Sequence, residues 1–386
     1  MQYIESLVSH YGWEGIALIV IILILFAVQI CFYAFRYLRI AKYRDSKRQT
    51  ILDNTPTVSV IVPLWSEDYT FLDERLPLFM AQEGVNFEVV IVYVGSSTDF
   101  FDDLLRLQQM LPNIVVTKIE SNPRFPISIK TALNVGVKAS HYEHMIFTTS
   151  DCYPVSDRWL SLMASGFKRG DVVLGYTALE SADGFARYFM RMSRMMTSVG
   201  WLSSAVRGKA YRGHRTNIGW TKTLYFEVRG FSHLNMNIGE DDLFVQRLLE
   251  RTDRVSVILS PKATLRQLCW GSLAWWTSQL RLYRSAVALY PARAQHTEMW
   301  ELRSRILFTL AVVVAIIFMP FEVKIFAAVL LLIRFIITLV SLRKVAQRLG
   351  EEGVLGKYPI FDFLNPIYMY CLHIFMNIKR DKRVWR

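Results

Sequence analysis

Long apolar segments at both ends place the strongest constraint on how this chain folds. Residues 15–35 form a run of 21 residues without a charged side chain, which is long enough to cross a bilayer as one helix. The run is too long for the core of a signal peptide, and no small-residue cleavage pattern follows it. The alternative is a helix buried in a protein core. Residues 1–14 contain no Lys or Arg, whereas basic residues follow the segment directly, namely Arg36, Arg39, Lys42, Arg44, Lys47 and Arg48. This asymmetry favours a membrane helix with its N-terminus outside and the following chain in the cytoplasm.

Residues 306–319 and 325–342 are apolar as well, and the short segment 320–324 with Pro320 separates them. They predict a tight transmembrane hairpin. Both ends should be cytoplasmic, because the hairpin is flanked by Arg303, Arg305, Arg343, Lys344 and Arg348. Arg334 lies near the middle of the second segment, so we expect it to face protein, to snorkel, or to mark a hairpin that does not cross fully. An apolar helical face with a basic tail follows at 367–386, which predicts an interfacial helix on anionic lipid.

Composition supports a membrane protein without disulfides. Hydrophobic residues make up 52% of the chain and the formal net charge is +12. Much of the positive charge lies beside the apolar segments, which indicates a membrane surface and no nucleic-acid partner. The cysteines are far apart in the sequence, with no CxxC pair, at Cys31, Cys152, Cys269 and Cys371. We therefore expect reduced thiols and no zinc site.

Between the apolar segments, strands and helices alternate. The predicted strands are 58–62, 89–94, 114–119, 145–149 and 172–174, and the predicted helices are 71–82, 128–139 and 158–167. This alternation predicts an α/β domain with a mostly parallel, Rossmann-like sheet. The turn after the first strand, residues 63–67, has no Gly-rich fingerprint, and no P-loop motif occurs in the chain. A dinucleotide-dependent dehydrogenase and a P-loop hydrolase are therefore disfavoured.

Two acidic positions are candidate site residues. The apolar run at 145–149 ends at Asp151, where a parallel strand would deliver one carboxylate to the ligand-binding edge of the sheet. The alternative is that Asp151 caps the next turn. Glu240, Asp241 and Asp242 follow Gly239 and precede an apolar helical pattern. At least one of these carboxylates should cap that helix, although three in a row exceed what capping needs.

Basic and aromatic residues could complete a binding site. The loop 207–215 contains Arg207, Lys209, Arg212, His214 and Arg215, which would suit a diphosphate, or would be a solvated run of charge. The Met-rich pattern at 181–202 predicts a helix whose methionines fill the core or touch lipid or acceptor. Residues 272–290 predict an aromatic amphipathic helix, with Trp276, Gln279 and Tyr283 on one face. Such a face suits a membrane interface or a platform for a sugar.

Taken in order, these motifs resemble a membrane-anchored family 2 glycosyltransferase with a GT-A catalytic domain. Residues 59–63 (SVIVP), 81–82 (AQ) and 87–99 (FEVVIVYVGSSTD) are similar to the opening of that family. Residues 130–136 (KTALNVG) are similar to its K-x-ALN-x-G helix, and 150–154 (SDCYP) to its DxD turn. The segment 217–226 and the pair 240–241 (ED) are similar to its second acidic region. Tyr93 and Val94 stand where the family has two Asp, Thr149 stands at the first DxD position, and the helix at Gln279 lacks QxxRW.

The resemblance implies an α/β GT-A domain at 55–290 on the cytoplasmic face. An anchor at 1–40, a transmembrane hairpin at 303–342 and a tail with an interfacial helix at 343–386 would hold it at a cell (inner) membrane. It implies Asp241 as catalytic base with Glu240 as its positioning partner, and Asp151 as ligand of Mg²⁺ or Mn²⁺. The implied donor-binding residues are Pro63, Trp65, Glu67, Gly95, Ser96, Lys130, Asn134, Asp151, Gln279, Arg281 and Arg284. The implied acceptor-binding residues are Asn217, Trp275, Trp276 and Tyr283.

The implied activity is inverting transfer of a sugar, of the hexosyl type, from a nucleotide-sugar to a membrane lipid or lipid-linked glycan in cell-envelope glycan synthesis. A single carboxylate can hold Mg²⁺ together with substrate phosphates. A base on the opposite side of the anomeric carbon inverts that centre. The alternatives are an inactive homologue that binds nucleotide-sugar or a partner enzyme, which the replaced Asp residues favour, and a membrane scaffold without a nucleotide site.

Overall fold

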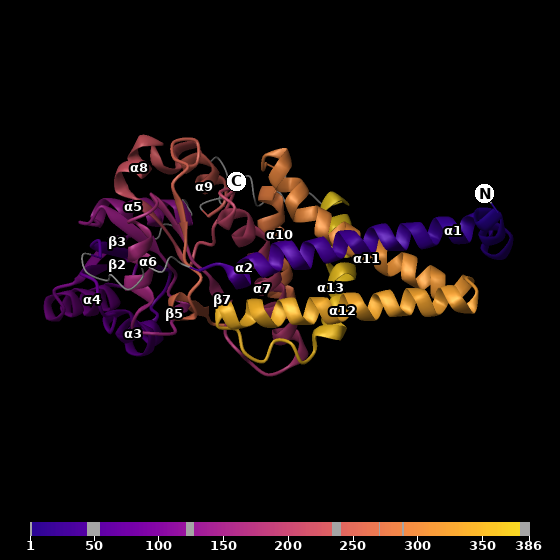
Figure 1. Ribbon diagram of the computed structural model, residues 1–386. Helices are drawn as coiled ribbons and strands as arrows, with labels where there is room; N and C mark the ends of the chain where they lie inside the picture. The colour runs from indigo at the N-terminus through magenta and orange to yellow at the C-terminus, as the bar shows by residue number, and fades with distance from the viewer. Residues whose placement is uncertain are drawn as a thin grey trace.

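A computed structural model describes residues 2–44, 55–120, 127–233, 241–269, 271–287 and 289–378. The molecule has an α/β part and a bundle of long helices that extends away from it (Figure 1). The chain starts at the far end of the bundle, enters the α/β part after α2, and returns to the bundle through α11 and α12 (Figure 1).

The main sheet has seven strands in the order β3-β2-β1-β4-β8-β6-β9. All neighbours pair in parallel except β8, which is antiparallel to both β4 and β6. The strands are β1 (Val58–Leu64), β2 (Phe87–Val94), β3 (Ile114–Ile119), β4 (His144–Phe147), β6 (Val172–Leu174), β8 (Ile218–Thr221) and β9 (Val255–Val257). Strands β1, β2 and β4 are almost entirely buried, as expected for apolar runs covered on both faces. The predicted parallel α/β architecture is confirmed.

A second sheet of three short strands lies beside the first, in the order β5-β10-β7. Its strands are β5 (Cys152–Pro154), β7 (Thr177–Leu179) and β10 (Leu265–Gln267). The sequence analysis expected only a turn at 152–154. The segment forms a strand because β10, more than 100 residues later, supplies its backbone partner.

The helices of the α/β part cover the main sheet. They are α3 (Leu76–Met80), α4 (Thr98–Met110), α5 (Ile129–Ala139), α6 (Trp159–Gly166), α7 (Phe185–Val206), α8 (Lys222–Glu227) and α9 (Leu243–Leu248). Helix α3 continues a π-helical turn at Phe71–Arg75, and short 3-10 turns lie at Gly230–His233 and Pro261–Ala263. Helix α5 begins at Ser128, whose hydroxyl accepts a hydrogen bond from the backbone N–H of Thr131. Gly136 lets α5 approach the sheet closely, since a Cβ there would lie 2.5 Å from Ile61.

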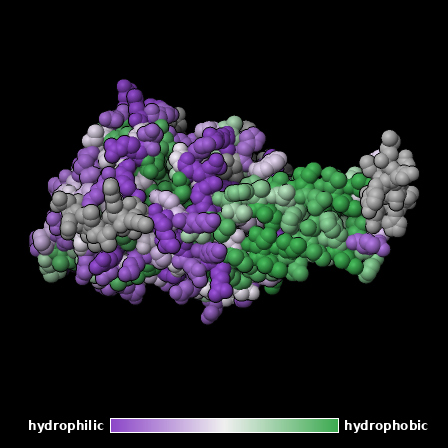
Figure 2. Space-filling model, in the orientation of Figure 1, coloured by the Kyte–Doolittle hydropathy of each residue, from purple (hydrophilic) through white to green (hydrophobic). Residues whose placement is uncertain are grey.

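The long helices are α1 (Gln2–Cys31), α2 (Leu38–Lys42), α10 (Leu273–Val287), α11 (Ala292–Phe318), α12 (Phe321–Leu349) and α13 (Tyr358–Ile378). A π-helical stretch, Phe32–Tyr37, joins α1 to α2. Among the described residues, two helices are long and apolar enough to cross a membrane, Gly12–Lys42 and Phe321–Leu349. Only 17% and 33% of their most apolar windows are buried, so they are not core helices of the α/β part. Figure 2 shows, on the face in view, an apolar belt along the bundle and a mostly hydrophilic surface over the α/β part.

Helices α11 and α12 pack against each other with Pro320 between them, as the predicted hairpin requires, and of these two only α12 is long and apolar enough to be a candidate span. Arg334 faces protein and is 1% exposed. Its guanidinium donates to both carboxylate oxygens of Asp362 in α13, at 2.5 and 3.1 Å, and to Gln29 and Tyr33 near the end of α1. One buried polar cluster therefore joins three helices and compensates for the cost of burying an arginine.

Helix α13 runs crosswise to α1 and α12 and contacts α7, α10 and α11 (Figure 1). Its exposed face contains apolar residues that include Ile367, Tyr370, Ile374 and Phe375. The predicted amphipathic face is therefore present, and Asp362 and Asn365 point inward from the same helix. The predicted basic tail after this helix lies outside the described residues.

Candidate active site

The carboxyl ends of β1, β2 and β4 meet at one edge of the sheet, because these three strands are parallel neighbours. Pro63 is near the end of β1, and Trp65 and Glu67 follow it on the exposed surface. Gly95 and Ser96 follow β2. The chain topology thus places these predicted donor-binding residues at the edge where α/β proteins bind ligands.

Asp151 follows β4 at the same edge, in a turn fixed from several sides. Its Oδ1 accepts from the hydroxyl of Thr149 at 2.5 Å, and its Oδ2 accepts from Nε2 of Gln267 at 2.8 Å. The backbone carbonyl of Asp151 accepts from the N–H of Leu268 at 2.8 Å, next to the β5–β10 pairing. The carboxylate is therefore held in place by hydrogen bonds and caps no helix.

Arg194 of α7 links this turn to a second group of polar residues. Its Nη2 donates to Oε1 of Gln267 at 3.2 Å, and its Nη1 donates to Nε2 of His214. Burial lowers the pKa of Arg194 to about 10. Burial and the nearby arginines hold the pKa of His214 well below its usual value, so this imidazole is neutral at pH 7. Its Nδ1–H then donates to the Thr216 hydroxyl at 2.6 Å.

Asp241 lies in a cleft whose other wall is cationic. The described lining encloses about 90 Å³ and consists of Arg194, Thr197, Ser198, Trp201, Arg212, His214, Arg215, Asp241, Asp242, Trp276, Gln279, Leu280, Leu282, Tyr283 and Ala286. Oδ2 of Asp241 accepts from the backbone N–H of Arg215 at 3.2 Å and lies 3.9 Å from Nη2 of Arg212. The backbone carbonyl of Asp241 accepts from the N–H of Gly213 at 2.7 Å. The basic loop and the acidic segment, about 30 residues apart in sequence, are thus bound directly to each other.

The adjacent carboxylate, Asp242, has a different role. Its Oδ1 accepts from the N–H of Leu243 at the start of α9, and its Oδ2 accepts from the hydroxyl of Tyr290 at 2.6 Å. Burial and the neighbouring Asp241 raise the pKa of Asp242 to about 6. The prediction that one acidic residue would cap the helix is confirmed for Asp242, and Asp241 remains the carboxylate that faces the cleft. Glu240 lies outside the described residues.

Helix α10 supplies the aromatic wall. Trp276, Gln279 and Tyr283 all line the cleft, as their helical spacing predicts. Arg194 lies over the ring of Trp276 at 5.4 Å, and Arg212 lies over the ring of Tyr283 at 3.9 Å. These contacts hold the guanidinium groups against aromatic faces inside the cleft.

Other predicted residues of α10 point elsewhere. Trp275 packs near Trp276 in a small cluster with α13. Arg281 lies over the ring of Phe375 at 5.2 Å. Arg284 points toward the sulfur of Met299 in α11, with Nη2 3.8 Å from it. The structure therefore does not place these three side chains in the lining of the Asp241 cleft.

Asn217 has no exposed surface. Its amide nitrogen donates to the carbonyls of Tyr176 and Ala263, and its amide oxygen accepts from the indole N–H of Trp159. Because these bonds use both ends of the amide, Asn217 has a structural role, joining β8 to α6 and the second sheet, and the acceptor-binding role expected for it is corrected.

Lys130 and Asn134 of α5 line a separate pocket of about 510 Å³ between α5 and α8. The side-chain oxygen of Asn134 accepts from the hydroxyl of Tyr225 at 3.1 Å. The structure thus does not bring these two predicted donor-binding residues into the lining of the Asp241 cleft.

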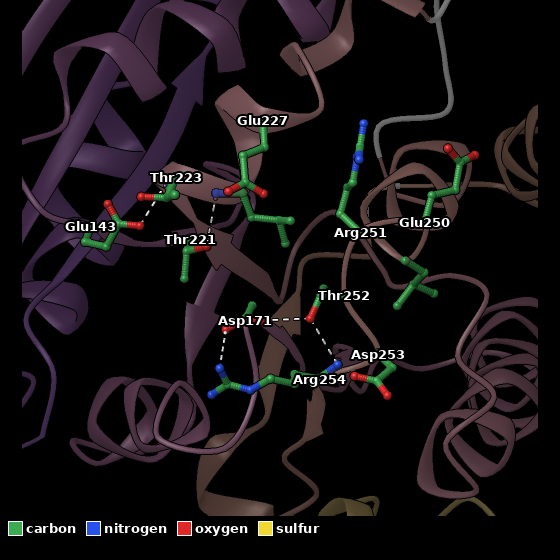
Figure 3. Close-up of a pocket in the computed structure, with 12 residues that line it drawn as sticks. Glu143, Asp171, Thr221, Thr223, Glu227, Glu250, Arg251, Thr252, Asp253 and Arg254 are labelled. Atoms are coloured by element: carbon green, nitrogen blue, oxygen red, sulfur yellow. Dashed lines mark hydrogen bonds and ion pairs between the residues drawn. The ribbon is translucent and has the colours of Figure 1, made fainter.

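A larger acidic pocket of about 710 Å³ lies elsewhere (Figure 3). Glu143 and Asp171, which line it, come just before β4 and β6. It is therefore at the amino ends of the parallel strands, the opposite edge from Asp151. Asp171 is already bound to Thr252 and Arg254 there. We therefore do not assign the active site to this pocket.

Sequence patterns did not identify Arg194 and Gln267 as site residues. Arg194 offered a weak signal, since it is a charged residue on the buried face of a Met-rich helix. Gln267 offered none, because its role depends on the pairing of β10 with β5.

The oxygen ligands near Asp151 could supply only part of the coordination shell of one hard cation. No group of three or more acidic, His or Cys side chains in the described part of the chain could hold a metal ion. Asp151 is one carboxylate with a hydroxyl neighbour, Thr149. Its Oδ1 accepts from Thr149 and, at 3.6 Å, from the thiol of Cys152, whereas its Oδ2 accepts from Gln267 and keeps a second lone pair. That set fits Mg²⁺ or Mn²⁺ provided that substrate phosphates and water complete the shell.

No protein-family model matches this sequence, and no curated protein matches it. Among solved structures, the mannosyltransferase PcManGT from Pyrobaculum calidifontis, in complex with GDP-Man and Mn²⁺, is similar at 17% identity and a TM-score of 0.53, covering 91% of this chain and 99% of that one. S. aureus TarS 1–349 in complex with UDP-GlcNAc is 19% identical with a TM-score of 0.42, over 80% of this chain and 89% of that one. With the sheet order described above, the likeness to PcManGT establishes the architecture: this chain has the GT-A-type fold of a glycosyltransferase.

Proposed function

We propose that this protein is a family 2 glycosyltransferase that transfers a sugar from a nucleotide-sugar to a lipid or lipid-linked acceptor at a membrane surface. The observation that supports this most is the cleft of Asp241, whose lining brings together two carboxylates, three arginines and an aromatic helix face. The GT-A-type fold and the complex of PcManGT with GDP-Man support a nucleotide-sugar donor.

In the proposed reaction, an acceptor hydroxyl attacks the anomeric carbon of the donor. Asp241 takes the hydroxyl proton, the new glycosidic C–O bond forms, and the bond from the anomeric carbon to the diphosphate oxygen breaks. Attack opposite the leaving group inverts the anomeric centre. Arg194, Arg212 and Arg215 provide positive charge for the departing nucleoside diphosphate. A Mg²⁺ or Mn²⁺ held by Asp151 would neutralise diphosphate charge in addition.

The apolar belt supports a membrane location (Figure 2). We propose that α1–α2 anchors the chain, that α11 and α12 form the hairpin, and that α13 lies in the interface. The catalytic domain at 55–290 would then face the cytoplasm at the inner membrane. This orientation rests on the basic residues that follow the first apolar segment.

The first test is transfer or hydrolysis of a nucleotide-sugar panel by purified full-length protein, with and without Mn²⁺. Asp241→Asn should lower turnover by about 100- to 10,000-fold, because the base is lost while the shape is kept. Asp253→Asn, an exposed acid at the opposite edge of the sheet, is the matched control and should leave turnover unchanged. Full turnover by Asp241→Asn would remove this residue from the mechanism.

A second candidate function is a nucleotide-sugar-binding protein without activity. The observation in its favour is Tyr93, which stands where the family has Asp. Its buried ring lies under the turn after β2, so close that a Cβ on Gly95 would be 2.3 Å from it, and its hydroxyl accepts from the N–H of Ser97. Donor binding without transfer or hydrolysis, under every acceptor tested, would favour this candidate.

A further inference from the structure

A groove of about 1110 Å³ lies between α1–α2, the end of α7 and the start of α11. One part of its lining is apolar and includes Ile24, Val28 and Phe35 from the N-terminal helices and Trp300 from α11. Ile24, Phe35 and Trp300 are largely exposed and continue the apolar belt. The groove therefore opens toward the region that a membrane would occupy.

The other part of the lining is basic. It contains Arg36, Arg39, Arg207, Lys209 and Arg293. No Asp or Glu lines the groove among the residues described. Arg293 and Arg207, together with partial desolvation, lower the pKa of Lys209. The rim thus concentrates positive charge at the edge of an apolar surface, which is complementary to a lipid with an anionic headgroup.

The loop 207–215 connects this groove to the catalytic cleft. Arg207, Lys209 and Tyr211 line the groove, whereas Arg212, the next residue, lines the cleft. Tyr211 packs against Tyr290, with 5.9 Å between the two ring centroids. The hydroxyl of Tyr290 in turn donates a hydrogen bond to Asp242. The groove and the cleft are therefore lined by adjacent residues of one loop.

We propose that this groove binds the lipid phosphate of the acceptor, with the hydrocarbon chain along α1 and α11 and the phosphate at Arg207, Lys209 and Arg293. The inference rests on the proposed function and names the class of acceptor: a sugar linked to a long-chain lipid through a phosphate or diphosphate, whose sugar hydroxyl is the group that attacks in the cleft. A bulk phospholipid is the less suitable occupant. The basic rim adjoins the cleft of Asp241, and only a lipid that takes part in the transfer reaction needs to bind beside that cleft.

The test uses full-length protein in a neutral detergent, with hexadecyl phosphate as probe and hexadecanol as its uncharged match. The variant Arg207→Gln/Lys209→Gln removes two exposed charges from the rim. Its affinity for hexadecyl phosphate should fall by about 25-fold, from about five-fold for each of the two cations. The matched control, Lys168→Gln/Arg169→Gln, removes the same charge from the exposed connection between α6 and β6 and should leave affinity unchanged.

A second variant, Ala27→Trp, fills the apolar wall and should weaken binding of hexadecyl phosphate and hexadecanol alike. Affinities that are unchanged in both variants overturn the inference. The inference is also overturned if Arg207→Gln/Lys209→Gln loses phosphatidylglycerol binding as strongly as hexadecyl phosphate binding and the protein does not prefer the single-chain phosphate. The rim would then be a general surface for anionic lipids.

Nucleotide-sugar binding by the same samples separates this inference from the proposed function. Retained donor binding with no lipid-phosphate binding overturns the groove inference alone. Rim-dependent lipid-phosphate binding by a protein that neither binds nor turns over any nucleotide-sugar supports the groove and overturns the transferase proposal.

Discussion

Glu351, just after α12, is bound inside the α/β part, and its removal should destabilise the whole protein. Its Oε2 accepts from Nε and Nη2 of Arg191 at 2.7 and 2.6 Å, and its Oε1 accepts from the Tyr176 hydroxyl at 2.6 Å. The Glu351 side chain is 0% exposed and that of Arg191 is 7% exposed. Arg191 lies one helical turn from Arg194, so this contact ties the hairpin to the helix that lines the cleft.

Glu351→Ala leaves a buried guanidinium without its counter-charge, which costs about 3–5 kcal/mol. The orphaned Tyr176 hydroxyl adds about 1–3 kcal/mol. We therefore expect the free energy of unfolding to fall by at least about 4 kcal/mol. Arg191→Met/Glu351→Met removes both charges and keeps side-chain volume, so it should be more stable than Glu351→Ala.

The assay is chemical unfolding of the detergent-solubilised full-length protein, followed by tryptophan fluorescence. Glu352→Ala is the matched control, because this exposed neighbour should change stability by less than about 0.5 kcal/mol. The reasoning is refuted if Glu351→Ala unfolds within about 1 kcal/mol of wild type, or if the double variant is less stable than Glu351→Ala.

Three further outcomes follow from the site. The pKa of Asp242 is raised to about 6 in the folded state, so its contribution to stability is largest below about pH 4 and is lost as the pH rises through 6. Over that pH interval, the free energy of unfolding of Asp242→Asn should therefore rise relative to that of wild type. A difference between the two proteins that does not depend on pH would contradict this prediction. Asp151→Asn should abolish the gain in donor affinity that Mn²⁺ gives and should leave donor binding without metal unchanged, as measured by calorimetry. If Mn²⁺ still raises the donor affinity of this variant, a residue other than Asp151 holds the metal. Arg194→Met should weaken donor binding by about ten-fold or more, from one charge-assisted hydrogen bond, and should raise the pKa of His214 in an NMR titration; an unchanged His214 titration would argue against their contact.

Local patterns were sufficient for much of this protein. The apolar runs of β1, β2 and β4 predicted buried parallel strands, since only a sheet covered on both faces accommodates them. Strand β3, at the edge of the sheet, was predicted as a strand and is partly buried. The spacing of Trp276, Gln279 and Tyr283 predicted a shared helix face, and all three line one cleft. The uncharged length of residues 15–35 predicted a helix with exposed apolar surface, which the structure has.

Long-range pairing decided the rest. The sequence by itself determined which residues are apolar, where the long apolar helices and the buried strands β1, β2 and β4 form, and that acids, arginines and aromatics were available for a site. Only the tertiary structure decided that Asp242 caps a helix while Asp241 faces the cleft, and that loop 207–215 divides its charges between cleft and groove. It also placed Gln267 beside Asp151 and Asp362 beside Arg334, since a buried charge is stabilised by whichever partner the fold brings near, regardless of its distance along the chain.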